Sequence, residues 1–222
     1  MARESAAILE LIRRHMLVGI IRAETEQEGR LYAETALEAG FHLVEFTLNG
    51  AGALDLVKEF SERKKKDTAF GVGTTMDVSQ AKRAIKAGAE FVVSPHTEPD
   101  IVAHCLEANV LVVPGVMTPS EAVRASNLGA PLIKVFPAEP LGGAEYIKAL
   151  RGPLADIRFM PTGGIRPRSI PDYIRAGVFA VGVGLATDRE LLRKGDREKL
   201  KAQMKEYVEA VAPFCGTRIT SH

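Results

Sequence analysis

Residues 127–136, Asn-Leu-Gly-Ala-Pro-Leu-Ile-Lys-Val-Phe, hold the pattern that decides the fold: a helix-like segment ends at a glycine, and an apolar run follows. The same junction occurs at Gly40, Gly88, Gly129 and Gly177, which are 48, 41 and 48 residues apart. One further apolar run lies between neighbouring junctions, so the repeating unit has about 20 to 24 residues, enough for one strand and one helix. The chain is therefore predicted to repeat a strand–helix unit.

Eight apolar runs of strand length occur along the chain, each followed by a turn and then by apolar residues at helical spacing. They are residues 17–22, 42–47, 69–73, 90–94, 110–113, 131–136, 157–161 and 178–183. Strands that alternate with helices form right-handed βαβ units and a parallel sheet. Eight units predict an α/β fold, a (β/α)8 TIM barrel with an N-terminal helix, and the last barrel helix is expected from residue 196 onward. An open, flavodoxin-like sheet is the alternative.

Composition limits the class of protein. The 222 residues are 46% hydrophobic and 26% charged, enough to bury a core, and α/β barrels of about 200 to 250 residues commonly form one domain. We therefore expect a single barrel domain over residues 1–222. The 29 Lys and Arg nearly balance 28 Asp and Glu, which predicts neither a nucleic-acid nor a membrane partner. Two cysteines far apart, and the lack of a leader-like or membrane-spanning run, predict a cytoplasmic protein.

Two charged residues interrupt strand-like runs where barrels carry their chemistry. Alternation places Leu132, Lys134 and Phe136 on one face of their strand, and barrel active sites lie at the carboxyl ends of strands. Burial lowers the pKa of a lysine and favours the neutral amine, which attacks a carbonyl carbon to form a Schiff base. Glu45 lies in a similar run four strands earlier and suits the proton transfers of that chemistry. The alternative is a buried ion pair without a chemical role.

Two glycine-rich segments accompany the last two predicted strands. Residues 162–164 (Thr-Gly-Gly) follow the seventh, and residues 181–184 (Val-Gly-Val-Gly) close the eighth. Barrels commonly bind phosphate between these two loops, although tight turns would give the same pattern. Residues 71–75 lack the third glycine and the acidic residue of a dinucleotide site. The five histidines lack the spacing of metal ligands, so no metal site is expected.

Six short motifs together point to a known family. They are Val-Glu-Phe-Thr-Leu at 44–48, Gly-Val-Gly-Thr at 71–74, Ser-Pro-His at 94–96, Val-Pro-Gly-Val-Met-Thr-Pro-Ser-Glu at 113–121, Lys-Val-Phe-Pro-Ala-Glu at 134–139 and Pro-Thr-Gly-Gly-Ile at 161–165. In this combination the chain resembles the KDPG/KHG aldolases from about residue 8 to 212. These class I enzymes cleave 2-keto-3-deoxy-6-phosphogluconate or 4-hydroxy-2-oxoglutarate to pyruvate and an aldehyde, glyceraldehyde 3-phosphate or glyoxylate.

The resemblance carries expectations about the site and the assembly. It implies a (β/α)8 barrel, usually a homotrimer, that needs no metal and no organic cofactor and takes a small-molecule substrate. It implies that Lys134 forms the Schiff base and that Glu45 is the general acid and base. The implied substrate-binding residues are Arg22, Thr74, Pro95, Phe136, Gly163, Gly164 and Gly184. Thr74 would bond the carboxylate of the pyruvyl group, and the glycines lie on the phosphate side.

Two positions depart from the family pattern. Asn49 stands where many members carry arginine, as in the phosphogalactonate-cleaving relatives, and Leu185 stands where a serine usually helps to hold phosphate. Because Asp188 adds a negative charge nearby, weaker selectivity for phosphate is expected, unless Arg166 and Arg168 supply the missing positive charge. The alternatives are a 2-dehydro-3-deoxy-6-phosphogalactonate aldolase and a catalytically silent barrel that acts in assembly or ligand binding.

Overall fold

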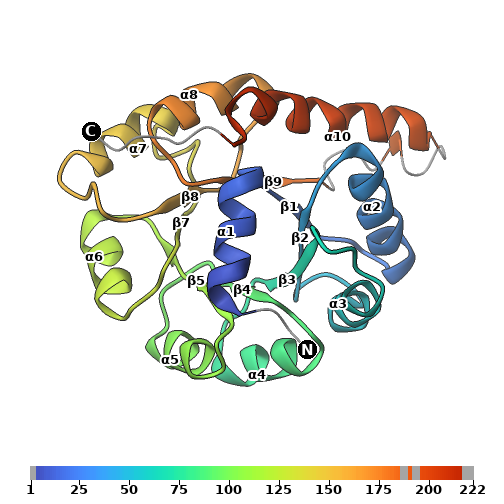
Figure 1. Cartoon of the computed structure of the whole chain (residues 1–222), viewed down its shortest axis with the longest axis horizontal. Helices are drawn as coiled ribbons and strands as arrows, with labels where there is room; N and C mark the ends of the chain where they lie inside the picture. Colours follow the sequence, from blue (N-terminus) through green and yellow to red (C-terminus); the bar gives the residue numbers. More distant parts are fainter. Residues whose placement is uncertain (1–3, 186–189, 192–195, 217–222) are drawn as a thin grey trace.

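Strands and helices alternate along the chain in the computed structural model, which describes residues 4–185, 190–191 and 196–216 (Figure 1). The strands are β1 Leu17–Ile21, β2 Leu43–Thr47, β3 Ala69–Gly73, β4 Phe91–Val93, β5 Leu111–Val113, β6 Gly115–Val116, β7 Ile133–Val135, β8 Phe159–Pro161 and β9 Val181–Gly184. The helices are α1 Ser5–His15, α2 Glu26–Ala39, α3 Ala53–Glu62, α4 Val78–Lys86, α5 Pro99–Glu107, α6 Pro119–Asn127, α7 Gly143–Arg151, α8 Ile170–Arg175 and α10 Arg197–Val211. Short 3-10 helices span Pro167–Ser169 (η1) and Ala212–Phe214 (η2). Each of the eight predicted strand runs overlaps an observed strand.

The strands close into a parallel barrel. Within the described ranges, hydrogen bonds form a six-stranded sheet ordered β5-β4-β3-β2-β1-β9 and a three-stranded sheet ordered β6-β7-β8. Pro114, which has no N–H group, separates β5 from β6 within one continuous stretch of chain. At the other junction, a bridge between Thr162 and Gly182 joins the ends of β8 and β9. The predicted (β/α)8 TIM barrel is confirmed.

Helix α1 closes the amino-terminal end of the barrel, and Figure 1 shows it lying across the ring of strands. Its apolar face buries Ile8, Leu11 and Ile12. These side chains pack with residues at or near the starts of the strands, including Val18, Leu43, Ala69, Leu111, Leu132, Met160 and Ala180. Burying each large aliphatic side chain contributes about 1.5–3 kcal/mol, so α1 is held firmly. The expected N-terminal helix is confirmed.

The glycine junctions end helices as the sequence predicts. Gly40 follows α2 with φ of 101°, and its N–H group donates to the carbonyls of Ala36 and Leu37. This left-handed conformation favours glycine because a side chain there meets the backbone. Gly88, Gly129 and Gly177 share the positive φ, at 98°, 91° and 84°. Each junction thereby turns the chain from a helix back towards the barrel.

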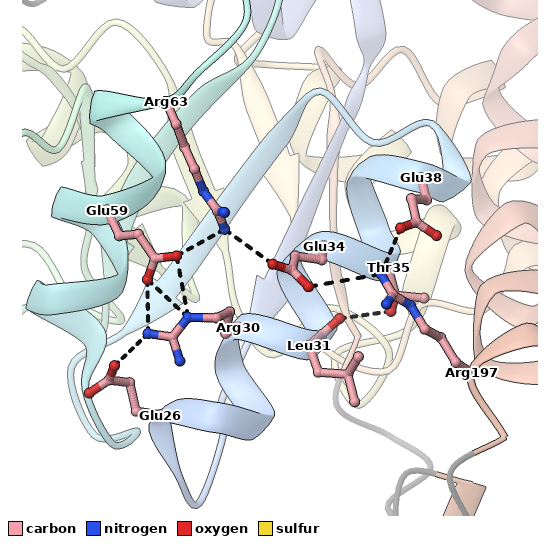
Figure 2. Close-up of polar contacts among 9 residues, drawn as sticks. All are labelled: Glu26, Arg30, Leu31, Glu34, Thr35, Glu38, Glu59, Arg63 and Arg197. Carbon is pink, nitrogen blue, oxygen red and sulfur yellow. Dashed lines mark hydrogen bonds and ion pairs between the residues drawn. The ribbon is translucent and has the colours of Figure 1, made fainter.

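The last helix, α10, packs against α2 and completes the outer layer (Figure 1). Asp196 caps it by accepting a hydrogen bond from the Lys199 N–H group. Its inner face buries Leu200, Met204, Tyr207 and Val211. Figure 2 shows Arg197 of this helix bonded to Glu38 of α2, at 2.6 Å. No helix within the described residues is both long and apolar enough to cross a membrane.

Candidate active site

A cavity of about 450 Å³ opens at the carboxyl ends of the strands, opposite α1. It is lined by all nine residues that the sequence nominated for the site: Arg22, Glu45, Thr74, Pro95, Lys134, Phe136, Gly163, Gly164 and Gly184. Thr47, Thr162, Ile165, Arg166 and Tyr207 also line it. The structure therefore brings together residues from seven strands or the loops that follow them. Another cavity, of about 400 Å³, lies between α2 and α3.

Lys134 occupies the middle of β7, with apolar layers below and an aromatic ring above. Leu132 is fully buried among the side chains that α1 covers, and Phe136 is 38% exposed at the mouth. The Lys134 Nζ atom lies 5.0 Å from the centre of the Phe136 ring. Lys134 as a whole is 7% exposed, so it is largely shielded from bulk water while it lines the cavity.

Glu45 reaches the same cavity from β2 and is 1% exposed. Neither of its carboxylate oxygens has a hydrogen-bond partner among the described residues. Leaving a buried carboxylate without partners is costly, so the observation points to a ligand or reactant that bonds it. The alternative of a closed Glu45–Lys134 ion pair does not describe this geometry, since no ion pair joins the two in the described chain.

Burial shifts both groups towards their neutral forms. It raises the pKa of Glu45, an effect that the positive charges of Lys134 and Arg22 oppose in part. It lowers the pKa of Lys134, and the charge of Arg22 lowers it further while Glu45 opposes the shift. A lysine with a lowered pKa supplies more neutral amine, and a carboxyl group with a raised pKa exchanges protons nearer neutral pH.

Gly73, at the end of β3, leaves the space that the Glu45 side chain fills. A Cβ atom built at position 73 would overlap the Glu45 carboxylate. β3 pairs with β2 so that Gly73 lies beside Thr47, two residues beyond Glu45. A glycine in the Gly-Val-Gly-Thr motif is thus a steric requirement for the position of the carboxylate.

Arg22 lies at the rim, just after β1. Its neighbour Ile21 accepts a hydrogen bond, of 3.2 Å, from the Thr47 hydroxyl. Thr47 lines the cavity and is 2% exposed, yet the sequence analysis did not nominate it. Alternation along β2, which puts Glu45 and Thr47 on one face, was the signal available.

The Gly163–Gly164 turn lines the cavity. Its carbonyl side is occupied, because the Ala138 N–H group donates to Thr162 at 2.8 Å and the Glu139 N–H group donates to Gly163 at 3.1 Å. Both glycines have positive φ, 98° and 84°. Among the described residues, the N–H groups of Gly163 and Gly164 donate no hydrogen bond. Unpaired N–H groups at a cavity surface suit an anion.

Leu185 does not lie where the sequence analysis expected a phosphate-binding position. Its side chain is 3% exposed and packs in the core over Gly19, near Phe41. Strand alternation is the reason, because Gly184 faces the cavity and Leu185 points to the opposite side. The expectation that Leu185 removes a phosphate-binding hydroxyl is therefore wrong, and Asp188 lies outside the described residues.

His96 follows β4, and Arg166 and Arg168 follow the Gly163–Gly164 turn. Arg166 lines the cavity, whereas Arg168, on η1, does not. His96 lies outside the cavity lining, and its Nδ1 atom is 2.9 Å from the Ser94 hydroxyl. In the described part of the chain, no group of three or more His, Cys, Asp or Glu side chains is placed to hold a metal ion.

Comparisons with known proteins agree with this geometry. The model of the family described as "KDPG and KHG aldolase" matches residues 8–203. The chain belongs to the KDPG and KHG aldolase family. A 2-dehydro-3-deoxy-phosphogluconate aldolase of Treponema pallidum is 31% identical over 92% of this chain and 97% of the relative.

Two solved structures of this kind are also similar. A 4-hydroxy-2-oxoglutarate aldolase/2-deydro-3-deoxyphosphogluconate aldolase from TTHB1 is 29% identical, with a TM-score of 0.77 over 91% of this chain and 98% of that one. A structure described as native KDPGal is 28% identical, with a TM-score of 0.77 over 89% of this chain and 94% of that one. Like its relatives, this member of the family is a class I pyruvate aldolase, a lyase.

Proposed function

We propose that this aldolase cleaves a 2-keto-4-hydroxy acid through a Schiff base on Lys134, with Glu45 transferring the protons. The observation that carries the proposal is a buried amine and a buried, unpartnered carboxylate that line one cavity without pairing. Surroundings that disfavour both charges prepare the amine for attack and the carboxyl group for proton exchange.

The steps follow from these two groups. The neutral Lys134 amine attacks C2 of the substrate, and Glu45 gives the resulting hydroxyl the proton with which it leaves as water. The ionised Glu45 then takes the proton of the C4 hydroxyl. The C3–C4 bond breaks, its electrons enter the iminium to form an enamine, and the aldehyde departs. Protonation at C3 and hydrolysis of the iminium release pyruvate and restore the amine.

The rim residues fit the pyruvyl half of the substrate. In this proposal Arg22 attracts the carboxylate, Thr74 donates a hydrogen bond to it, and Pro95 and Phe136 form the walls. Arg22 has no carboxylate partner among the described residues, so its charge is available. Asn49, at the position where many relatives carry an arginine, is exposed and lies outside the cavity lining. In this proposal Arg22 is therefore the arginine that binds the substrate carboxylate.

For the other half of the substrate, we propose a 2-keto-3-deoxy-6-phospho-sugar acid or 4-hydroxy-2-oxoglutarate, giving glyceraldehyde 3-phosphate or glyoxylate. The unpaired N–H groups of Gly163 and Gly164, with Gly184 opposite, suit an anionic terminus. A 2-dehydro-3-deoxy-6-phosphogalactonate aldolase is the second candidate. Asn49 favours it, as does the likeness to the solved KDPGal structure. A silent barrel is disfavoured because Lys134 and Glu45 share the cavity.

Assembly and location are also proposed. We expect a homotrimer, as the family resemblance implies, and the exposed side chains of Met76, Met117 and Val123 offer apolar surface for contacts between copies. Both cysteines, Cys105 and Cys215, are free thiols, in keeping with a cytoplasmic location. Light scattering that gives one 24.0 kDa chain in solution would overturn the trimer.

Borohydride trapping with pyruvate tests the central step. Reduction of the iminium should attach a three-carbon acid to Lys134 alone, as mapped by mass spectrometry of peptides. Attachment to another lysine would refute the assignment. A coupled assay of pyruvate release should then rank the phosphogluconate, phosphogalactonate and hydroxyoxoglutarate substrates beside their unphosphorylated analogues.

A further inference from the structure

The cavity between α2 and α3 lies at the amino-terminal side of the barrel. It is lined by the facing sides of the two helices and by the segments that lead into β2 and β3. The cavity that holds Lys134, here called the catalytic cavity, takes Glu45 and Thr74 from the middle of β2 and from just beyond the end of β3. Among the described residues the two cavities share no lining residue, so a molecule can occupy one while the other stays open.

The floor of this second cavity is aromatic. Phe41, Phe60 and Phe70 line it, and each is almost wholly buried. The Phe60 and Phe70 rings are tilted against each other, with centroids 5.3 Å apart, and Leu37 adds an aliphatic wall from α2. The volume of about 400 Å³ is that of an ordinary small-molecule site. A floor of rings suits a flat aromatic body, which packs against ring faces and edges and displaces water.

The acidic side chains that line this cavity are already neutralised. Figure 2 shows Glu34 bonded to Arg63, at 3.3 Å, and Glu38 bonded to Arg197, at 2.6 Å. Both glutamates line the cavity. A cationic ligand would have to compete with a guanidinium for either carboxylate, so the cavity does not favour a cation.

One basic side chain of the lining has no such partner. Arg63 is bonded to two glutamates, and Lys64 forms an ion pair with the buried carboxylate of Glu90. Lys65 also lines the cavity, and it forms no ion pair in the part of the chain that the structure describes. Its positive charge is therefore available to a ligand.

The turn that carries Lys65 is held in place by hydrogen bonds within the chain. The Lys65 N–H group donates to the Thr68 hydroxyl oxygen at 3.1 Å, and that hydroxyl donates to the Lys65 carbonyl at 3.0 Å. The His42 ring, which stacks on His15, donates from its Nδ1 atom to the Asp67 carbonyl oxygen at 2.8 Å. Because the turn is ordered beforehand, little backbone entropy remains to be lost on binding.

We propose that this cavity is a second ligand site, and that it binds a small aromatic carboxylate. The aromatic body lies on the phenylalanine floor, and the carboxylate pairs with the Lys65 ammonium group. A single available positive charge matches the one negative charge of a carboxylate better than the nearly two charges of a phosphate monoester. The inference does not depend on the proposed aldolase function, since it uses none of the residues that line the catalytic cavity.

Calorimetric titration with 2-naphthoate tests the site, and the neutral 2-naphthamide is the matched probe without a charge. The parent should bind 2-naphthoate saturably, and more tightly than 2-naphthamide. Lys65→Gln should weaken the binding of 2-naphthoate about 3- to 10-fold and leave that of 2-naphthamide within about twofold of the parent. Lys58→Gln, on the exposed face of α3 and outside the cavity lining, is the matched control and should change neither.

Two further variants locate the bound probe. Leu37→Trp fills the cavity from a position on α2 that is only partly buried, so it should weaken the binding of both probes at least about tenfold. Lys134→Arg changes the catalytic cavity alone, and it should bind 2-naphthoate as the parent does.

Absence of saturable 2-naphthoate binding by the parent would overturn the inference. Equal binding by the parent and Lys65→Gln, or equal losses in Lys65→Gln and Lys58→Gln, would do the same, because Lys65 would then make no contribution of its own. Unchanged binding in a folded Leu37→Trp protein, or weaker binding in Lys134→Arg, would place the probe outside this cavity and refute the site. Lys65→Gln changes an exposed side chain, so its result decides even where Leu37→Trp fails to fold.

Discussion

Charged side chains on the outer helices are paired with one another, whereas the charged side chains that line the barrel cavity are not paired with described charges. Across α2, α3 and α10 every guanidinium in Figure 2 has a carboxylate partner. Arg30 bonds Glu59 and Glu26 at 2.9 and 2.6 Å, and Arg63 bonds Glu59 and Glu34 at 3.0 and 3.3 Å. In the cavity, Glu45, Lys134, Arg22 and Arg166 are not paired with one another or with other described charges.

The difference separates stability from chemistry. The paired groups are largely solvated, so their mutual attraction stabilises the helices only slightly. The cavity groups are buried or confined, and a missing partner leaves hydrogen-bonding capacity that a substrate satisfies. Changes in the cavity should therefore alter activity strongly and stability weakly, and changes in the helix network should do the reverse.

The largest effect is expected from Lys134→Arg. A guanidinium keeps its proton and cannot attack a carbonyl, so turnover should fall by at least about 10⁴-fold and borohydride trapping should vanish. The matched control is Lys148→Arg on the exposed face of α7, which should keep full activity. Residual trapping in Lys134→Arg would show that another amine carries the reaction.

Glu45→Gln should lower turnover by about 10² to 10⁴-fold, the usual contribution of a positioned proton-transfer group, while slow trapping of pyruvate persists. A neutral side chain avoids the desolvation that raises the pKa of Glu45, so the free energy of unfolding should not fall. Stopped-flow assays and thermal melts measure the two quantities. Normal turnover would exclude Glu45 from the mechanism.

His15 is a half-buried titratable group outside the cavity. Its ring stacks on His42 with centroids 3.6 Å apart, and burial, with the charges of His42 and Arg14, lowers the pKa of His15 from 6.5 to about 4. The unfolded chain therefore binds the proton first as the pH falls, so stability is lost between pH 6.5 and 4. Allowing for solvent screening of a half-buried ring, the loss is about 1–2 kcal/mol.

His15→Gln should flatten that loss of stability in urea titrations at pH 6.5 and 4.5, with kcat/KM unchanged at neutral pH. His104→Gln on α5 is the control and should keep the parent's pH dependence. If both variants behave like the parent, His15 does not cause the acid sensitivity.

Glu59→Gln is expected to have the smallest effect. Arg30 and Arg63 hold the pKa of Glu59 below its usual value, so its contribution is present above the ordinary carboxyl pKa and lost as the pH falls. For so exposed a pair the cost at pH 7 is about 0.5–1 kcal/mol, or a few degrees in Tm, and it should shrink in 0.5 M salt, a concentration of about the order that screens surface charges. Activity should not change, and Glu62→Gln, on the same helix, should change neither quantity.

The sequence was sufficient to predict the barrel and to single out the two charged residues, Lys134 and Glu45, that the structure places in one cavity. Period-two apolar runs and helix-ending glycines predicted the strands, and Lys134 and Glu45 stood out because charges are rare in such runs. The predicted run 110–113 stops before Pro114, yet a strand resumes at Gly115, since a missing N–H group breaks a ladder without turning the chain.

The far end of the site was not predictable in the same way. Tyr207 has the i, i+3, i+4 spacing of its core neighbours Met204 and Val211, so the pattern alone assigns it to packing. Its approach to Arg166 depends on how α10 docks, which no local pattern encodes. The direction of Leu185 could have been inferred from the sequence, because side chains alternate along a strand and only one of Gly184 and Leu185 can face the cavity.

Under the proposed mechanism, a single methyl group at position 73 would separate recognition from turnover in this barrel. The space for the Glu45 carboxylate exists only because position 73 lacks a Cβ atom. Alanine there would displace the carboxylate while leaving Lys134, Arg22 and Phe136 where they are. Such a protein would still capture a keto acid on its amine, but it would lack an aligned proton donor to release the product. A catalyst would thereby become a covalent receptor for pyruvate.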